Sequence, residues 1–285
     1  MAAVRSHSFV AWAVVVAFAS GCEAASSEQA GYSEVVLACG PVINSPPAAL
    51  VAGVFSDPVS TNCGAELGGA LNVDWETFGG APAEFYEPST ASELLVAGVI
   101  ILLAADGGPG DPCAAPAAPE NFRASLGGCG ELEGENGKSW FDLMQRTISE
   151  VRHDLAIPYP MARASDALVV GDIASDDPPE GVIGAPPMAV VEVAALLAHE
   201  VSHAVYGRHV ACADEQERTE CDETAEGAYG VGAWWAARWA LVNAAVLDFD
   251  DCDAARYSSA QQCSAINESD DFASCEADIL RCSGT

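Results

Sequence analysis

Two histidines and a glutamate near residue 200 have the spacing of a metal site. Residues 198–203 read AHEVSH, so His199 and His203 are four positions apart and Glu200 follows the first. On a helix, positions i and i+4 lie on one face, so both imidazoles can reach a single ion. Neutral imidazole nitrogen suits Zn²⁺, and two histidines leave room for a third ligand and a water. Glu200 would be the general base that takes a proton from this water.

The segment that carries these residues is predicted to be a helix with a second, apolar face. Residues 188–206 contain no Gly or Pro, and Gly207 follows them. Apolar side chains recur at three- and four-residue spacing, at Val190, Val193, Leu197 and Val201. The helix can therefore pack against a core through one side and present both histidines on another.

A His-Glu-x-x-His segment on a helix resembles the motif of the zincin metallopeptidases, and the resemblance covers roughly residues 188–247. It implies an α+β domain in which the motif helix packs over a mixed sheet. It also implies an upstream edge strand that aligns a peptide substrate, for which residues 167–173 are the candidate. The implied reaction is hydrolysis of a peptide bond by zinc-bound water, with Glu200 taking the proton and passing it to the leaving amine.

The third metal ligand has three candidates, and two of them are glutamates. Residues 222–230, which read DETAEGAYG, resemble the glutamate helix of the gluzincin group, where the ligand lies downstream of the motif. Glu223 fits best, and Glu226 lies one turn further on nearly the same face. The gluzincin pattern usually has an aspartate where this chain has Gly227. Another group would therefore have to orient a motif histidine.

His209 is the third candidate. It follows the motif at the ligand spacing of the metzincin group. That pattern expects a glycine where Tyr206 stands, and it needs a downstream methionine, whereas no Met occurs after Met188. We therefore rank Glu223 before Glu226, and Glu226 before His209. An electrophile should also stabilise the oxyanion of the intermediate. The candidates are Tyr206, Tyr229, His153 and Arg208.

The N-terminus is typical of an export signal. Arg5 precedes an unbroken apolar run of eleven residues, 9–19, which has the length of a signal-peptide core and is too short to span a bilayer. Residues 19–22 read ASGC, which resembles a bacterial lipobox with Cys22 as the lipidated residue. The lipobox prefers Leu where Ala19 stands, so cleavage as an ordinary secretory signal is the alternative. We expect an exported protein anchored to the cell envelope by lipid on Cys22, or a secreted one.

The cysteine count agrees with an oxidising compartment. If Cys22 carries lipid, ten of the eleven cysteines remain, enough for five disulfides. Short loops favour the pairs Cys113–Cys129, Cys212–Cys221 and Cys275–Cys282, although the sequence does not fix the pairing.

The net charge limits the classes of partner that the protein can bind. The chain has 42 acidic and 11 basic residues, which give a net charge of −31. This balance disfavours nucleic acid and anionic membrane surfaces.

Other segments predict the surrounding organisation. Residues 23–33 are small and polar, which is typical of a flexible tether, and residues 34–86 suggest loops and short strands. Thr90 and Glu93 form a capping-box pattern before an apolar run over 94–105, which predicts a buried helix. The β-branched residues 99–101 leave a strand as the alternative. Apolar spacing predicts an amphipathic helix over 139–157 and another helix over 222–247.

We therefore expect four regions: a lipoprotein signal peptide over 1–22, a tether and N-terminal region over 23–138, a zincin-like catalytic region over 139–247, and an acidic cysteine-rich tail over 248–285. The predicted function is an exported zinc metallopeptidase that acts on peptide or protein substrates and contacts the membrane only through its lipid. The alternative is a non-catalytic surface lipoprotein with a structural zinc ion or no metal.

Overall fold

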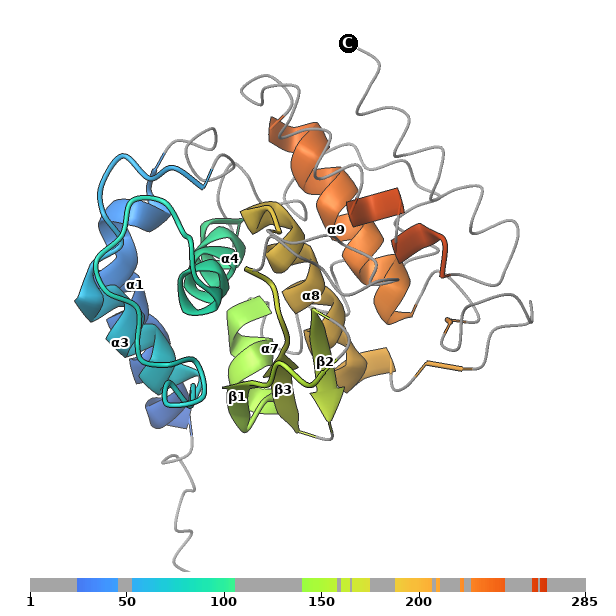
Figure 1. Ribbon diagram of the computed structural model, residues 1–285, viewed down its shortest axis with the longest axis horizontal. Coiled ribbons are helices and arrows are strands. Elements are labelled where there is room, and N and C mark those ends of the chain that lie inside the picture. The colour runs from blue at the N-terminus through green and yellow to red at the C-terminus, as the bar shows by residue number, and fades with distance from the viewer. Residues whose placement is uncertain are drawn as a thin grey trace, which may run out of the picture.

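The computed structural model describes residues 25–45, 53–105, 140–157, 160–164, 166–174, 188–206, 209–210, 221–222, 227–243, 258–260 and 262–265. Its elements in chain order are α1 (Ala25–Ile43), α3 (Thr61–Ala70), α4 (Ala91–Ala105), α7 (Trp140–Thr147), β1 (Glu150–His153), β2 (Met161–Ala164), β3 (Ala167–Val170), α8 (Val190–Tyr206) and α9 (Ala228–Asn243). The described part of the chain thus combines helices with one small sheet (Figure 1).

Helix α8 lies at the centre of this arrangement. It packs against α4 on one side and α9 on the other, and it also contacts α7 and strand β2 (Figure 1). The four apolar positions predicted for its core face are all at most 5 % exposed: Val190, Val193, Leu197 and Val201. The predicted helix over 188–206 is confirmed, with its first residue at Val190.

Helix α4 confirms the helix that was predicted from the capping-box pattern of Thr90 and Glu93. The Glu93 Oε2 atom accepts the backbone N–H of Thr90 at 3.0 Å, and the Thr90 Oγ1 atom accepts the backbone N–H of Glu93 at 3.3 Å. These two bonds satisfy amides that have no partner inside the helix. The apolar side chains that follow are almost fully buried against α8 and α1.

The N-terminal part is more helical than the sequence suggested. Helix α1 begins at Ala25, inside the predicted tether, and α3 lies in the region predicted to hold loops and short strands. On α1, Val35, Cys39 and Val42 recur at three- and four-residue spacing and are buried. A disulfide between Cys39 and Cys63 ties α1 to α3. The packing of this buried face stabilises α1, and the small, polar composition of the segment gave no indication of it.

The sheet has the order β1-β3-β2, with β1 parallel and β2 antiparallel to β3. The strand predicted over 167–173 is confirmed over Ala167–Val170 as β3, but it is the central strand. Its expected role as the edge strand that aligns a substrate is therefore wrong, because both of its sides are already paired. Strand β2 lies at the edge of this sheet, and it is the strand in contact with α8.

The predicted helix over 139–157 is only half correct. Helix α7 ends at Thr147, and β1 begins at Glu150. Val151 suits a strand as well as a helix, and pairing with Leu168 on β3 decides between them. Leu155, an apolar residue near the end of the predicted helix, is 67 % exposed.

The helix predicted over 222–247 begins later than expected. Cys221 forms an isolated antiparallel bridge with Val210, so Asp222 stands outside the helix, and α9 starts at Ala228. The bridge is a tertiary contact, which helical spacing along the sequence does not reveal.

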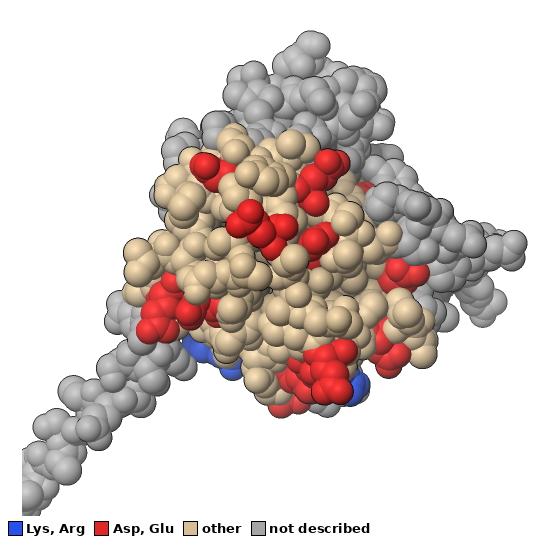
Figure 2. Space-filling model, turned by 60° about the vertical axis from the view of Figure 1, so that its left-hand side comes forward, with Lys and Arg blue, Asp and Glu red and all other residues tan. Residues whose placement is uncertain are grey.

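Acidic side chains are more prominent than basic ones on one face of the described surface (Figure 2). The face in Figure 2, which turns the left-hand side of Figure 1 toward the viewer, carries many Asp and Glu side chains and few Lys or Arg. In the described part of the chain, no helix has both the length and the apolar character needed to cross a bilayer. The predicted signal peptide with Cys22 lies outside the described residues, as do both cysteines of the pairs Cys113–Cys129 and Cys275–Cys282, and Cys212.

Candidate metal centre

Helix α8 holds the two motif histidines on one face, as the spacing predicts. His199 is 4 % exposed and Glu200 is 5 % exposed, so both lie inside the protein. The His199 and His203 rings are 5.0 Å apart between centroids and nearly perpendicular. The Ser202 hydroxyl donates to the His199 carbonyl at 2.6 Å, which satisfies a buried hydroxyl without leaving the helix.

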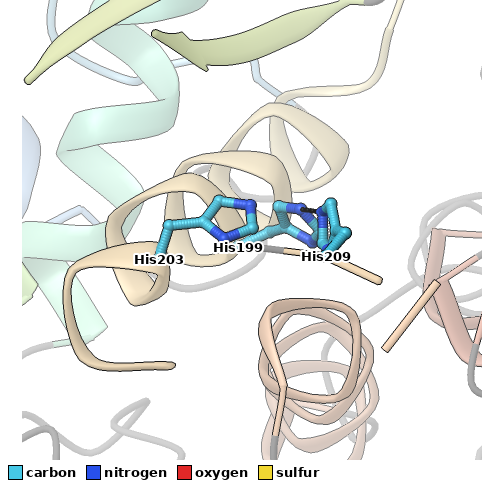
Figure 3. A group of neighbouring side chains, drawn as sticks. All are labelled: His199, His203 and His209. Atoms are coloured by element: carbon cyan, nitrogen blue, oxygen red, sulfur yellow. Dashed lines mark hydrogen bonds between the residues drawn. The ribbon is translucent and has the colours of Figure 1, made fainter. Parts of the chain in front are cut away.

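A third histidine joins this pair. His209 lies just after α8, and its ring centroid is 5.1 Å from that of His199 and 4.4 Å from that of His203. One ligand nitrogen from each of the three rings lies within 4.8 Å of the other two. The Nε2 atoms of His199 and His209 are only 3.2 Å apart, and Figure 3 shows the rings of all three residues gathered beside α8.

The backbone next to His209 is fixed by a short bridge. Val210 and Cys221 exchange two hydrogen bonds, of 2.7 and 2.8 Å between nitrogen and oxygen. Cys221 is also disulfide-bonded. The next residue, Asp222, places its Oδ1 atom 2.7 Å from His209 Nδ1. The bridge therefore places the Asp222 carboxylate next to Nδ1 of His209, which we call the outer nitrogen of this ring.

Residues near the C-terminus contact the opposite side of the cluster. The Gln262 Oε1 atom lies 3.2 Å from His199 Nδ1. Two further bonds hold this segment in place: the Ser259 hydroxyl donates to the Ala233 carbonyl at 2.8 Å, and the Asp222 N–H donates to the Ala265 carbonyl at 3.0 Å. The region predicted as a separate tail thus supplies a neighbour of a motif histidine.

Tyr229, in the first turn of α9, packs against two rings of the cluster. It stacks on His209 with 4.3 Å between ring centroids, and it meets His199 edge-on at 4.6 Å. Its backbone N–H donates to Asp222 Oδ2 at 2.6 Å, so the same carboxylate contacts both His209 and the start of α9. Of the two oxyanion candidates whose side chains the structure describes, Tyr229 and His153, Tyr229 lies at the cluster.

The electrostatics favour neutral imidazole. Burial lowers the pKa of His199 well below its ordinary value of 6.5, and the nearby His203 and His209 lower it further. Neutral imidazole is the form that binds metal ions. The Glu200 carboxylate lies beside the cluster, with its Oε2 atom 4.0 Å from His203 Nε2.

The donor set fits zinc. Two nitrogens bound to one tetrahedral Zn²⁺ at about 2.0–2.1 Å stand about 3.4 Å apart. The distance of 3.2 Å between the Nε2 atoms of His199 and His209 is close to this value. The third nitrogen lies within 4.8 Å of the other two, and the rings would have to move closer together to complete the set. Three imidazoles leave one tetrahedral position for water or substrate.

The other sequence candidates are placed as follows. Glu223, Glu226 and Arg208 lie outside the described residues, as does the side chain of Tyr206. His209, ranked third by sequence, is the third-ligand candidate that the structure describes, and it lies in the cluster.

One sequence candidate lies elsewhere, and two contact residues were missed. His153 stacks on Phe78, and its backbone N–H donates to the Thr77 hydroxyl, so its described contacts belong to the sheet region. Asp222 and Gln262 contact the cluster, and no pattern in the sequence predicted a role for either. The one signal for such residues was Gly227, which stands where the gluzincin pattern has an aspartate. Its presence meant that another residue would have to orient a motif histidine.

Comparison with known proteins adds no name to this site. No family model, no curated protein and no solved structure matches the chain.

Proposed function

We propose that the protein is a zinc-dependent hydrolase in which His199, His203 and His209 are the metal ligands. The observation that supports it is the convergence of three imidazoles from two segments, with two Nε2 atoms 3.2 Å apart. This spacing suits a shared tetrahedral ion. Bound zinc would act as a Lewis acid and lower the pKa of a coordinated water.

Glu200 is the proposed general base. It follows His199 on α8 and is 5 % exposed, so its carboxylate lies beside the cluster in a low-dielectric setting. It takes a proton from the attacking water and returns it to the leaving group. Tyr229, which touches two ligand rings, is the proposed electrophile that stabilises negative charge on the substrate oxygen.

A peptide is the proposed substrate, within an α+β domain of zincin type. Strand β2 is at the edge of the sheet and contacts α8, which carries the proposed ligands. A strand edge presents backbone N–H and C=O groups that can pair with an extended chain. This role passes to β2 because β3, the strand first expected to have it, is central.

We also propose that the protein works outside the cytoplasm, held by lipid on Cys22. The Cys39–Cys63 disulfide, together with disulfide-bonded Cys221 and Cys263, supports an oxidising compartment. The strongly acidic surface argues against nucleic acid as a partner.

The test is zinc content and peptide hydrolysis of the full chain, purified in detergent with its disulfides formed. We expect about one zinc per chain in wild type. Alanine at His199, His203 or His209 should remove most of it, whereas alanine at Glu223 or Glu226 should not. His153→Ala is the matched control, because it removes a histidine outside the cluster and should leave zinc content unchanged.

Glu200→Gln separates an enzyme from a structural zinc protein. The glutamine cannot accept the proton, so zinc should stay and hydrolysis of a quenched fluorescent peptide mixture should fall about 10²- to 10⁴-fold. Zinc bound in wild type without any hydrolysis would favour the structural alternative. Wild type without stoichiometric metal would refute the proposed function.

A further inference from the structure

We propose that Asp222 and Gln262 are positioning residues that select which nitrogen of His209 and His199 faces the metal. The proposal deepens the proposed function and rests on it for the identity of the ion. Neither residue touches the reacting atoms. Each acts through the outer nitrogen of one histidine ring, and the two come from segments 40 residues apart in sequence.

Asp222 acts on His209. An ionised carboxylate can only accept hydrogen bonds. Its Oδ2 atom accepts the Tyr229 backbone N–H at 2.6 Å, and its Oδ1 atom lies 2.7 Å from His209 Nδ1. His209 can donate this hydrogen bond only with a proton on Nδ1, and in the neutral ring that leaves the Nε2 lone pair directed into the cluster.

Gln262 acts in the same way on His199. Its amide oxygen lies 3.2 Å from His199 Nδ1, and an amide oxygen can only accept a hydrogen bond, which the N–H of the ring must donate. His199 then also carries its proton on Nδ1. If both rings are neutral with the proton on Nδ1, neither Nε2 atom can donate the hydrogen bond that their 3.2 Å separation would otherwise allow, and each presents a lone pair to the other. Such a pair is repulsive without a cation between them, so the two acceptors prepare the site for a metal ion.

Two glycines make room for these acceptors. A Cβ atom at Gly227 would overlap the Asp222 carboxylate, and a Cβ atom at Gly232 would overlap the Gln262 amide. Both acceptors thus occupy space that any other residue at these positions would fill. Gly227 is the residue that replaces the aspartate of the gluzincin pattern, and here its small size makes room for the carboxylate of Asp222, five residues earlier in the chain.

Covalent links fix the backbone at both acceptors. Asp222 directly follows Cys221, and Gln262 directly precedes Cys263. Both cysteines are disulfide-bonded. The Asp222 N–H also donates to the Ala265 carbonyl at 3.0 Å, which joins the two segments to each other. Rigid support of this kind is what a positioning residue needs to keep its partner ring in one orientation.

The experiment measures zinc affinity by chelator competition and histidine tautomers by ¹⁵N NMR, both on the full chain in detergent. Gln262→Met removes the acceptor with little change in volume and should weaken zinc binding about 10- to 100-fold. Gln262→Glu keeps an acceptor oxygen and should restore most of the affinity. Gly232→Ala displaces the acceptor and should resemble Gln262→Met. Gly40→Ala, whose added Cβ meets no atom within 4 Å, is the matched control.

The NMR measurement tests the tautomers directly and needs no variant to fold. In metal-free wild type at pH 7.5, His199 and His209 should both carry the proton on Nδ1, and Gln262→Met should shift His199 alone toward a mixture. A proton on Nε2 of His199 in wild type would overturn the proposal for Gln262. Unchanged zinc affinity in Gln262→Met would do so as well. Failure of the wild type to bind zinc would refute the proposed function, whereas the tautomers would still report on the two acceptors.

Discussion

Glu192, in the first turn of α8, gives the sharpest prediction about stability. Its side chain is 9 % exposed, and its Oε2 atom accepts the backbone N–H of Ala189 at 2.7 Å. Burial raises its pKa from 4.5 to about 7, although the bond from Ala189 acts in the opposite direction. The perturbation is Glu192→Gln, which keeps an acceptor oxygen for Ala189 and removes the ability to ionise.

The sign of the effect follows from proton linkage. Between pH 4.5 and about 7, folded Glu192 keeps a proton that the unfolded chain has already lost. The stabilisation from this group is therefore complete below pH 4.5 and is lost as the pH rises through 7. A shift of this size corresponds to about 3 kcal/mol. Glutamine has no such dependence, so the variant should gain about 3 kcal/mol relative to wild type between pH 4.5 and 8.

The assay is urea unfolding of the metal-free full chain in detergent at several pH values between 4.5 and 8. The difference in unfolding free energy between variant and wild type removes the contribution of the other acidic residues, which both proteins share. Glu93→Gln makes the matching change at the exposed cap of α4. A difference that stays flat with pH for Glu192→Gln would refute the reasoning, and so would an equal rise in Glu93→Gln.

Two further predictions concern α8. Gly98→Ala on α4 would place a Cβ atom 2.7 Å from Val193 Cγ1 and 3.3 Å from the backbone nitrogen of Ala194, so α8 must shift. We expect the free energy of unfolding in urea to fall by about 1–3 kcal/mol. Gly69→Ala, whose added Cβ atom meets nothing within 4 Å, is the control. Because the pKa of His199 is lowered by burial, the unfolded chain binds more protons below pH 6.5, and the metal-free protein should lose up to about 1.4 kcal/mol per pH unit as the pH falls. His199→Gln should reduce this slope, and an unchanged slope would contradict the assignment.

Much of the proposed centre could be predicted from local sequence. The four-residue spacing of His199 and His203 is a property of a single helix, and α8 reproduces it because its apolar stripe packs into the core. The capping pattern of Thr90 and Glu93 likewise defines the start of α4 through bonds within three residues. Such features depend on neighbours in sequence, so they can be read without tertiary contacts.

Other features of the fold depended on partners distant in sequence. Val151 suits a helix and a strand alike, and pairing with β3 decided for β1. The segment from Ala25 looked like a tether, because its own composition is small and polar. Burial of Val35 and Cys39, and the bond from Cys39 to Cys63, account for α1.

The contacts around the three histidines also divide into those set by local sequence and those set by partners distant in sequence. The sequence by itself placed His199 and His203 on one helical face with Glu200 beside them, and it offered His209 among three candidates for the third ligand. Only the tertiary structure brought His209 to the cluster, through the bridge between Val210 and Cys221. It alone also placed Gln262 against His199, 63 residues along the chain. Helical periodicity sets the first of these relations over a single turn, whereas the others require segments that meet only when the chain has folded.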